Sequence, residues 1–203
     1  MAKSTRVENW AAFLGLMLPV IAVSALWLST VELVDANIIL PVRHSVQFAY
    51  PFLLLVMVAR PLQQLLRQPW TAALLRRRRI IGVAFAGAMT AHLILIAFRF
   101  WYTPELSYPT GNLIVGGGAY ALLYLMVITS FDGPKRALGP KRWKILHRTG
   151  LIYAALIFGV PRSLQELSEF EYLKLGVPML LVVLIRLAAW QQSRRQDNRR
   201  SRA

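Results

Sequence analysis

Three histidines are the residues of this chain whose chemistry could support a redox or metal site. His92 lies inside a run of nineteen residues, positions 80 to 98, that contains no Asp, Glu, Lys or Arg. The run follows four consecutive arginines, so it predicts a membrane-spanning helix pinned at its start by a basic block. At about 1.5 Å per residue from Arg79, His92 should lie roughly 20 Å along this helix, beyond the middle of the hydrocarbon layer. An ionisable side chain at that depth is a candidate functional residue.

The other two histidines are expected nearer the membrane surfaces. His147 follows Lys144 at the start of a later apolar run, and His44 adjoins Arg43 at the outer end of an earlier one. For both, a hydrated interfacial residue is the alternative to a ligand role. For His92, the alternative is a neutral imidazole bonded to a carbonyl or hydroxyl group of a neighbouring helix.

Cysteine is absent from the sequence, which excludes disulfides, thiolate-ligated metals and iron–sulfur clusters. Redox chemistry would therefore need a bound cofactor held by His or Met. Three methionines could supply a thioether ligand: Met89, Met126 and Met179. Core packing is the commoner role for each. Small or flat residues, Ala84, Phe85 and Ala88, lie one and two turns before His92 on the same helix face and would leave room for a planar group.

The composition indicates an all-α polytopic membrane protein. The 203 residues are 56% hydrophobic, and the mean hydropathy is +0.46. This length holds six apolar stretches of about 20 residues and leaves no room for a soluble domain beside them. We therefore expect a single domain over residues 1–203 in a lipid bilayer. The net charge of +15 does not indicate nucleic-acid binding, because the basic residues fall in the gaps between apolar runs.

Six membrane-spanning helices are expected from these apolar runs. They lie at about 10–29, 44–59, 80–98, 113–131, 141–160 and 172–190. We expect the first run to be kept as an anchor and not removed as a signal peptide, although Lys3 and Arg6 flank it. Between the runs, residues 30–43 should form a loop dipping into the interface. Residues 60–79 should form a basic connector with a short amphipathic helix on the membrane surface, and residues 194–203 a basic tail.

The distribution of basic residues predicts the orientation. Nineteen Lys and Arg residues lie on the side of the N-terminus, the connector, the segment from Lys135 to Arg148 and the tail, and four lie on the other side. This asymmetry places both termini in the cytoplasm, most simply in a bacterial inner membrane. Arg186 falls inside the last apolar run. We expect it to reach the cytoplasmic headgroups or to pair inside the bundle, so that leucine there is tolerated for insertion.

Several motifs in the middle of the chain carry a family resemblance. They are ARPLQQLL in the connector, RRRRIIGVAF followed by AHL in the third span, and TSFDGPKRALGPKRWKILHRTGLIYAALIF at the fourth-to-fifth junction. This pattern resembles the ferric-reductase-like transmembrane family, whose members include the heme-binding membrane subunit of a bacterial periplasmic methionine sulfoxide reductase system. The resemblance covers about residues 60–158. It implies b-type heme bound by histidines of the third and fifth spans, with His92 and His147 at matching positions.

The chain departs from the family pattern at both expected histidine pairs. Val160 stands where the family commonly places a second fifth-span histidine, and the arginine block stands where two-heme members carry a further third-span histidine. His92 and His147 should also differ in depth by well over 10 Å, whereas two axial nitrogens on one iron are only about 4 Å apart. We therefore expect at most one heme, ligated by His92 and not jointly by His92 and His147. His44, a methionine or water could complete the coordination of the iron.

Two functions remain open at the level of the sequence. The first is an integral membrane electron-transfer subunit with b-type heme, at most the membrane component of an oxidoreductase. Because the sequence has no Gly-rich dinucleotide motif, its electrons would come from outside the chain. The family resemblance implies a quinone or a flavoprotein as the external donor and a membrane or periplasmic protein as the partner. The second is a heme-free accessory subunit of the same fold that packs against a larger membrane complex.

Overall fold

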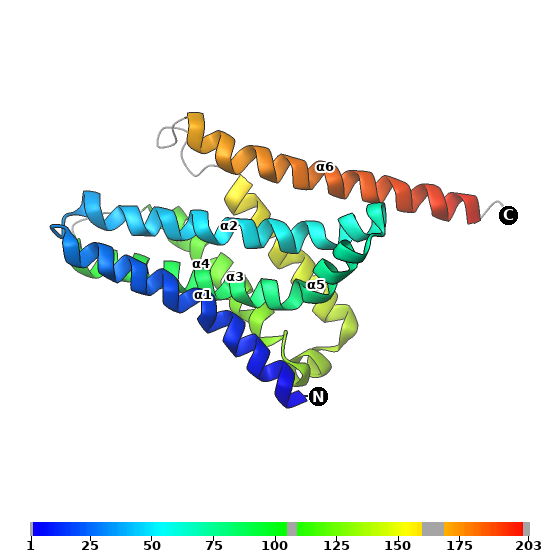
Figure 1. Cartoon of the computed structure of the whole chain (residues 1–203), viewed down its shortest axis with the longest axis horizontal. Coiled ribbons are helices and arrows are strands. Elements are labelled where there is room, and N and C mark those ends of the chain that lie inside the picture. Colours follow the sequence, from blue (N-terminus) through cyan, green and yellow to red (C-terminus); the bar gives the residue numbers. More distant parts are fainter. Residues whose placement is uncertain (1, 105–108, 160–168, 201–203) are drawn as a thin grey trace. The chain divides into compact units, whose positions relative to one another are not determined.

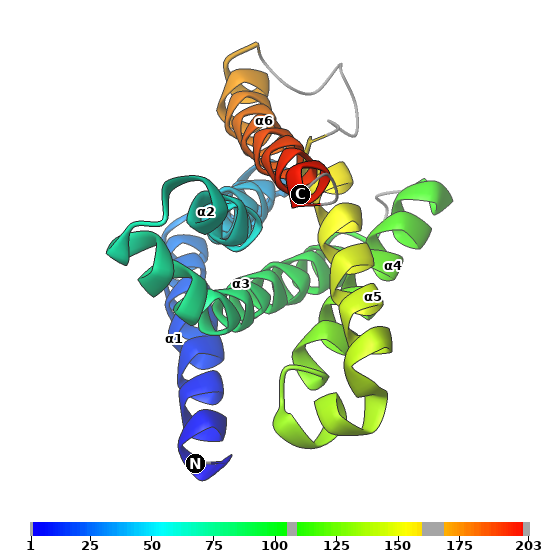
Figure 2. The same ribbon diagram turned by 90° about the vertical axis from the view of Figure 1, so that its right-hand side faces the viewer.

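The computed structural model describes residues 2–104, 109–159 and 169–200, and these residues form helices and no strand (Figure 1, Figure 2). The prediction of an all-α protein is confirmed. The helices are α1 (Ala2–Thr30), α2 (Asp35–Leu66), α3 (Pro69–Tyr102), α4 (Thr110–Ile128), α5 (Asp132–Gly159) and α6 (Glu169–Arg200). Val160 lies outside the described residues.

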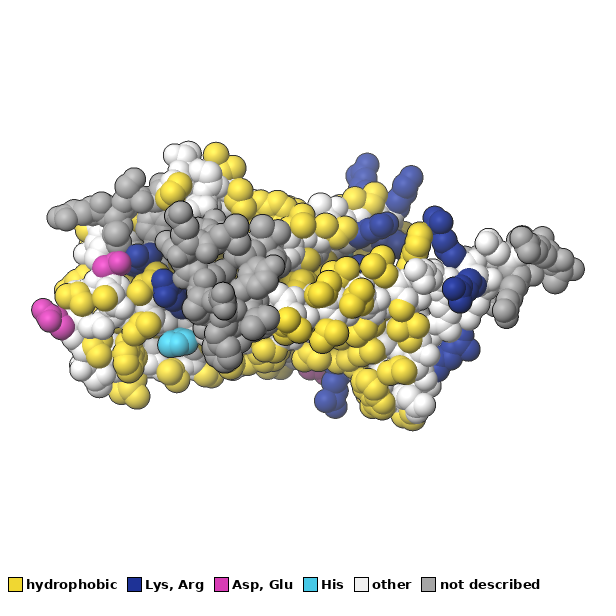
Figure 3. Space-filling model, turned by 90° about the horizontal axis from the view of Figure 1, so that it is seen from above, with side chains coloured by type: hydrophobic (Ala, Val, Ile, Leu, Met, Phe, Trp, Pro, Cys, Tyr) yellow, Lys and Arg dark blue, Asp and Glu magenta, His cyan; other side chains and the backbone are white. Residues whose placement is uncertain are grey.

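Five helices in the described part of the chain are long and apolar enough to cross a membrane: α1, α2, α3, α4 and α6. The exception is α5, whose first seventeen residues carry seven charged side chains and whose apolar end reaches the last residue before an undescribed segment. Hydrophobic side chains cover much of the face seen in Figure 3, as expected for a surface that meets lipid. The chain is a multi-span membrane protein.

The helices belong to two compact units. The first contains residues 1–52 and 80–150, and the second contains residues 53–79 and 151–203. Helices α2, α3 and α5 therefore contribute to both units. All three histidines belong to the first unit. The sequence-based prediction of one domain over residues 1–203 stays a prediction.

Helix α2 begins nine residues before the predicted span, so the expected loop over residues 30–43 is wrong beyond Val34. The carbonyl of Val34 accepts hydrogen bonds from the amides of Asn37 and Ile38 and so starts the helix. Asp35 occupies the first turn, where the helix dipole favours a carboxylate. Its two oxygens accept from Nε and Nη2 of Arg99 at 2.7 and 3.0 Å. This two-point ion pair joins the start of α2 to the end of α3.

A short turn replaces the predicted surface helix between the second and third spans. Helix α2 continues to Leu66, Arg67 adopts a left-handed φ of 52°, and α3 begins at Pro69. Proline suits the first position of a helix and disfavours helical geometry in the residue before it. The buried Thr71 hydroxyl donates to the Gln68 carbonyl at 2.8 Å and contacts the Gln63 amide, which ties the two helices together. The arginine block is therefore helical and part of α3.

Two arginines of the second unit contact the backbone of α2 near Pro61. A proline has no N–H, so the carbonyl of Met57, four residues earlier, loses its usual helical partner. Arg186 of α6 donates to this carbonyl at 3.3 Å, and Nε of Arg78 donates to the preceding carbonyl of Val56 at 2.9 Å. Of the two outcomes expected for Arg186, pairing inside the protein is the one observed.

This contact predicts the behaviour of an Arg186→Leu variant. We expect the variant to insert into the membrane, because leucine is more apolar, but to lose about 1 kcal/mol of stability with the hydrogen bond. Carbonate extraction measures insertion, and the melting temperature in detergent measures stability. The matched control is Arg195→Leu on the exposed part of α6.

A second substitution tests the cause. Pro61→Ala restores a backbone N–H for the Met57 carbonyl, so Arg186→Leu should cost less in that background. Failure of Arg186→Leu to insert, or an equal loss of stability in both backgrounds, would contradict the assigned role.

Helix α5 bends at Gly139, as the yellow-green part of the ribbon shows in Figure 2. Gly139 has φ 76° and ψ 160°, a conformation that side chains rarely tolerate, and Pro140 follows it. The bend separates a short charged helix from the longer segment that carries Trp143 and His147. The predicted start of the fifth span at Lys141 thus coincides with the start of this second segment.

Small residues on α3 let α1 approach closely within the first unit. A Cβ atom at Gly87 would overlap the backbone carbonyl of Phe13. Buried alanines on the same helix, Ala84, Ala88 and Ala91, continue this small-residue surface. The close packing of α1 on α3 thus depends on the missing side chain of Gly87.

Candidate functional site

The start of α2 contacts Nδ1 of His92. Its Nδ1 lies 3.1 Å from the carbonyl oxygen of Val42 and 2.9 Å from the hydroxyl oxygen of Ser45. The Ser45 hydroxyl also lies 2.8 Å from the Val42 carbonyl, to which it donates. Ser45 is only 3% exposed, and His92 is half-buried. The three groups form a closed polar cluster between two apolar helices.

The cluster determines the tautomer of His92. A carbonyl oxygen can only accept, so the contact between Val42 and Nδ1 requires a proton on that nitrogen. With the Ser45 proton directed to Val42, the Ser45 oxygen also accepts from Nδ1, and all three distances are satisfied. A neutral imidazole in this tautomer carries its lone pair on Nε2. Metal-ligating histidines commonly have this arrangement, with one nitrogen donating to a carbonyl and the other binding the metal.

The residues before His92 on its helix face are covered by protein. Ala84, Phe85 and Ala88 are all buried, as is Leu95 on the following turn. These small and flat side chains therefore serve helix packing in this structure. Space for a planar group beside them is a sequence-based expectation that their burial does not support.

Two tyrosines attach α4 to α3 just before His92. The Tyr120 hydroxyl donates to the carbonyl of Met89 at 3.1 Å. The Thr90 hydroxyl donates to the Ala86 carbonyl, so it accepts from the Tyr124 hydroxyl, 3.1 Å away. The two phenol rings stack with centroids 6.3 Å apart. These bonds fix the backbone of α3 within one turn of His92.

His147 is held at the other end of α4. Its Nε2 lies 3.1 Å from the hydroxyl oxygen of Thr129, whose proton is donated to the Leu125 carbonyl at 2.7 Å. Nε2 of His147 must therefore be the donor, which makes it unsuitable as a ligand atom in this arrangement. The Trp143 ring packs on the imidazole with centroids 4.2 Å apart, and its N–H donates to the Thr129 carbonyl at 3.0 Å. These contacts secure the junction of α4 and α5.

The structure does not bring His92 and His147 together. Thr129, which binds His147, lies nine residues after Tyr120 on α4, or about 13 Å along the helix. Tyr120 is level with Met89 of the antiparallel α3, and His92 lies about 4.5 Å further in the opposite direction. The two imidazoles are therefore separated by roughly 18 Å along the helix axes, far more than the ~4 Å between axial ligands of one iron.

The other predicted ligand candidates lie in ordinary surroundings. His44 is exposed in the first half of α2. Met179 is buried in α6, and Met126 packs so closely on Gly150 that a Cβ there would overlap its sulfur atom. Among the residues that the structure describes, no group of three or more His, Asp or Glu side chains could hold a metal ion.

Comparison with known proteins assigns the family. Residues 45–160 match the family described as ferric reductase like transmembrane component. The matched segment is 116 of the 203 residues and contains His92, Ser45 and His147. The chain belongs to this family. The suggested resemblance is confirmed, and the match extends fifteen residues further toward the N-terminus than the motifs indicated.

Relatives of this ferric-reductase-like chain include heme-binding subunits. The chain is similar to protein-methionine-sulfoxide reductase heme-binding subunit MsrQ of Azospira oryzae, at 30% identity over 66% of this chain and 58% of that protein. MsrQ of Rhodospirillum rubrum is 37% identical over 54% of this chain and 52% of that protein. Magnetosome protein MamZ of Magnetospirillum gryphiswaldense is 26% identical over 76% of this chain and 25% of that protein.

The chain spans a little over half the length of the MsrQ proteins it matches. No solved structure matches it. His44 lies one residue before the segment that matches the family, and Val160 is the last residue of that segment.

Sequence reasoning missed the residues that hold the two histidines. Ser45 and Val42 lie 47 and 50 residues before His92, which they contact. No local sequence pattern reveals a contact over such a separation. Trp143 could have been found, because it lies four residues before His147 and so shares its helix face. Thr129 stands at the end of α4, where its hydroxyl would be expected to bond to a backbone carbonyl and not to a histidine.

Proposed function

We propose that this chain is an integral membrane electron-transfer subunit that binds one b-type heme, which His92 would hold through Nε2. The observation that carries the proposal is the hydrogen bond from Nδ1 of His92 to the Val42 carbonyl. The bond places the proton on Nδ1, and His92 lies within a helix long and apolar enough to span a membrane. The names of the MsrQ relatives support the same cofactor.

Heme iron accepts and releases one electron at a time, which is the chemistry the group would supply when bound. The protein would contribute the ligand, its orientation and an apolar surrounding. Ser45 and Val42 would keep the proton on Nδ1 and so keep the lone pair on the nitrogen that faces the metal. The burial of Ser45 keeps water away from this bond.

His147 takes no part in binding this heme. Its Nε2 donates to Thr129, and its ring is covered by Trp143. Its role is to hold the junction between α4 and α5. Another ligand would complete the coordination of the iron. The candidates are His44, a methionine and water.

Electrons would reach the heme from outside the chain. A quinone or a flavoprotein is the proposed donor, and a membrane or periplasmic oxidoreductase is the proposed acceptor. The word "subunit" in the names of the MsrQ relatives supports a protein partner. On this proposal, the chain is the membrane component of an oxidoreductase.

An absorbance spectrum of the purified protein tests the proposal. The reduced-minus-oxidised difference should show the sharp α and Soret bands of a b-type heme. A featureless difference spectrum from folded protein, prepared from cells supplied with a heme precursor, would contradict it.

A heme-free accessory subunit is the second candidate. The contacts of both histidines favour it, since each is hydrogen-bonded to another helix in the way expected of a purely structural imidazole. Such a protein would use the ferric-reductase-like fold only to pack against a larger membrane complex. A featureless difference spectrum is the result that this candidate predicts.

The proposed location is the bacterial inner membrane, with both termini in the cytoplasm. The excess of basic residues on one side, nineteen against four, supports this orientation. It predicts that the turn between α1 and α2 faces the periplasm and that the junction of α4 and α5 faces the cytoplasm.

Reporter insertions at two described turns test the orientation. Alkaline phosphatase inserted after Glu32 should be active, because this enzyme folds only in the periplasm. The same insertion after Phe131 should be inactive. Green fluorescent protein should give the opposite pattern at the two positions. Reversed signals would overturn the proposed topology.

A further inference from the structure

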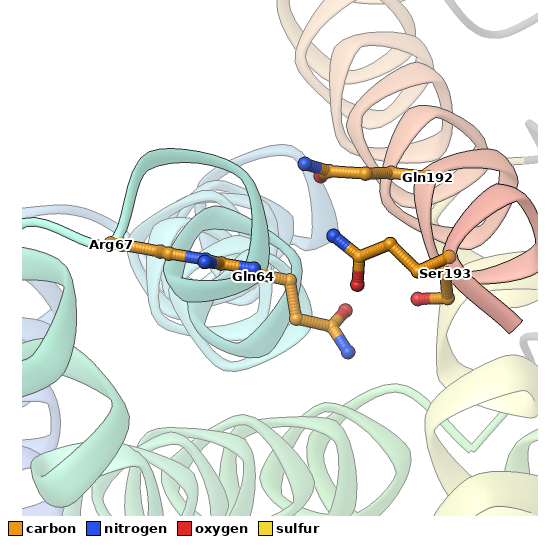
Figure 4. Close-up of a pocket in the computed structure, with 5 residues that line it drawn as sticks. Gln64, Arg67, Gln192 and Ser193 are labelled. Carbon is orange, nitrogen blue, oxygen red and sulfur yellow. The ribbon is translucent and has the colours of Figure 1, made fainter. Parts of the chain in front are cut away.

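A polar pocket lies in the second unit, between the end of α2 and the end of α6 (Figure 4). Its cavity volume is about 190 Å³. Figure 4 shows Gln64 and Arg67 extending from the α2 side and Gln192 and Ser193 from α6. The lining residues are Gln64, Arg67, Gln192, Ser193 and Gln196. The lining therefore has one positive charge, several amide and hydroxyl groups, and no acidic side chain.

Two features of the pocket suggest a ligand. The Oε1 atom of Gln192 is buried and has no hydrogen-bond partner among the described residues. A buried acceptor without a partner is costly and calls for a donor that a ligand or water would bring. Arg67 holds a left-handed φ of 52°, a strained conformation for a residue other than glycine, which places its guanidinium at the pocket.

The position of the pocket matches the depth of lipid headgroups. Trp190, two residues before Gln192, is 51% exposed, and Trp70, three residues after Arg67, is 55% exposed. Exposed tryptophans near the ends of membrane-spanning helices are typical of the membrane–water interface. A second arginine, Arg194, stacks on Trp190 with its guanidinium 4.2 Å from the ring centroid and does not line the pocket.

We propose that this pocket binds a phosphate group that carries hydroxyls, as in the glycerol phosphate headgroup of phosphatidylglycerol. Arg67 would bind the phosphate oxygens, and a ligand hydroxyl would donate to Oε1 of Gln192. A volume of 190 Å³ equals about six water molecules and is smaller than the ~300 Å³ of the smallest drug-sized pockets. The pocket therefore fits a headgroup and is too small for a nucleotide or a heme.

Native mass spectrometry of the purified protein with added lipids tests the proposal. The wild-type protein should retain phosphatidylglycerol in preference to phosphatidylcholine. Arg67→Asn should weaken this retention roughly tenfold, because it removes a charge-assisted hydrogen bond, while asparagine tolerates the left-handed backbone. The matched control is Arg194→Asn, which removes the same charge two residues beyond Gln192 and should leave retention unchanged.

Gln192 has a separate test. Phosphatidic acid has the phosphate without the glycerol hydroxyls, so the wild-type protein should prefer phosphatidylglycerol to it. Gln192→Leu should remove this preference and keep the preference over phosphatidylcholine. Unchanged melting temperatures without added lipid would show that both variants fold.

Free glycerol 3-phosphate distinguishes the two sources of the ligand. Displacement of phosphatidylglycerol by millimolar glycerol 3-phosphate, dependent on Arg67, supports the same site with a soluble ligand. If glycerol 3-phosphate does not displace phosphatidylglycerol, and lipid retention still depends on Arg67, the result supports the lipid headgroup as the ligand. Equal retention of phosphatidylcholine and phosphatidylglycerol by the wild-type protein, or equal losses in Arg67→Asn and Arg194→Asn, would overturn the proposal.

Discussion

Replacement of His92 by alanine should abolish the heme absorbance of the purified protein, whereas His147→Ala should leave most of it. The first variant removes the proposed axial ligand. The second removes a hydrogen bond to Thr129 and a ring contact with Trp143, which stabilise the junction of α4 and α5. The Soret absorbance per mole of folded protein is the measurement.

Ser45→Ala gives an intermediate control. This variant keeps the Val42 carbonyl as a partner of Nδ1, so heme should stay bound while the reduction potential shifts. Size-exclusion profiles of all three variants report whether they fold. Equal loss of absorbance in His92→Ala and His147→Ala would mean that both histidines serve one heme, and that the assigned separation of about 18 Å is wrong.

Substitution of Gly87 by alanine should destabilise the protein by about 1 to 3 kcal/mol, an unusual cost for adding one methyl group. The new Cβ would overlap the backbone carbonyl of Phe13, and a backbone cannot move aside as a flexible side chain can. Helix α1 would have to shift away from α3 and lose close packing along the neighbouring alanines. The melting temperature in detergent is the measurement.

Gly117→Ala on α4 is the matched control. A Cβ at Gly117 meets nothing within 4 Å, and alanine favours a helix over glycine by up to about 1 kcal/mol. The control should therefore leave the melting temperature unchanged or raise it slightly. Equal effects of the two substitutions would contradict the close approach of α1 to α3.

The apolar runs were sufficient to predict an all-helical chain and the approximate positions of most of its helices. Long uncharged stretches predicted α4, the apolar part of α3 and the end of α1 to within a few residues, because burying polar backbone in lipid leaves few alternatives to a helix. Helix α1 begins eight residues before the predicted span. The family resemblance located His92 and His147. Arg186 was correctly expected either to pair inside the protein or to reach the headgroups, since an intramembrane charge needs a partner or an escape route.

The extent of α2 could not be predicted in this way. The sequence predicts that the second span ends at residue 59, before Arg60-Pro61, because proline removes a helical hydrogen bond. In the structure, arginines from distant parts of the chain contact the carbonyls near Pro61, and the helix continues to Leu66. The polar partners of His92 were missed for the same reason. A contact between α2 and α3 arises from tertiary packing, and no short sequence pattern encodes it.

The molar ratio of heme to polypeptide in the purified protein, measured by the pyridine hemochrome method, tests the central claim most directly. Ligation by His92 alone predicts a ratio close to one that falls to zero in His92→Ala. A ratio near zero in folded wild-type protein, or near two, would contradict the account.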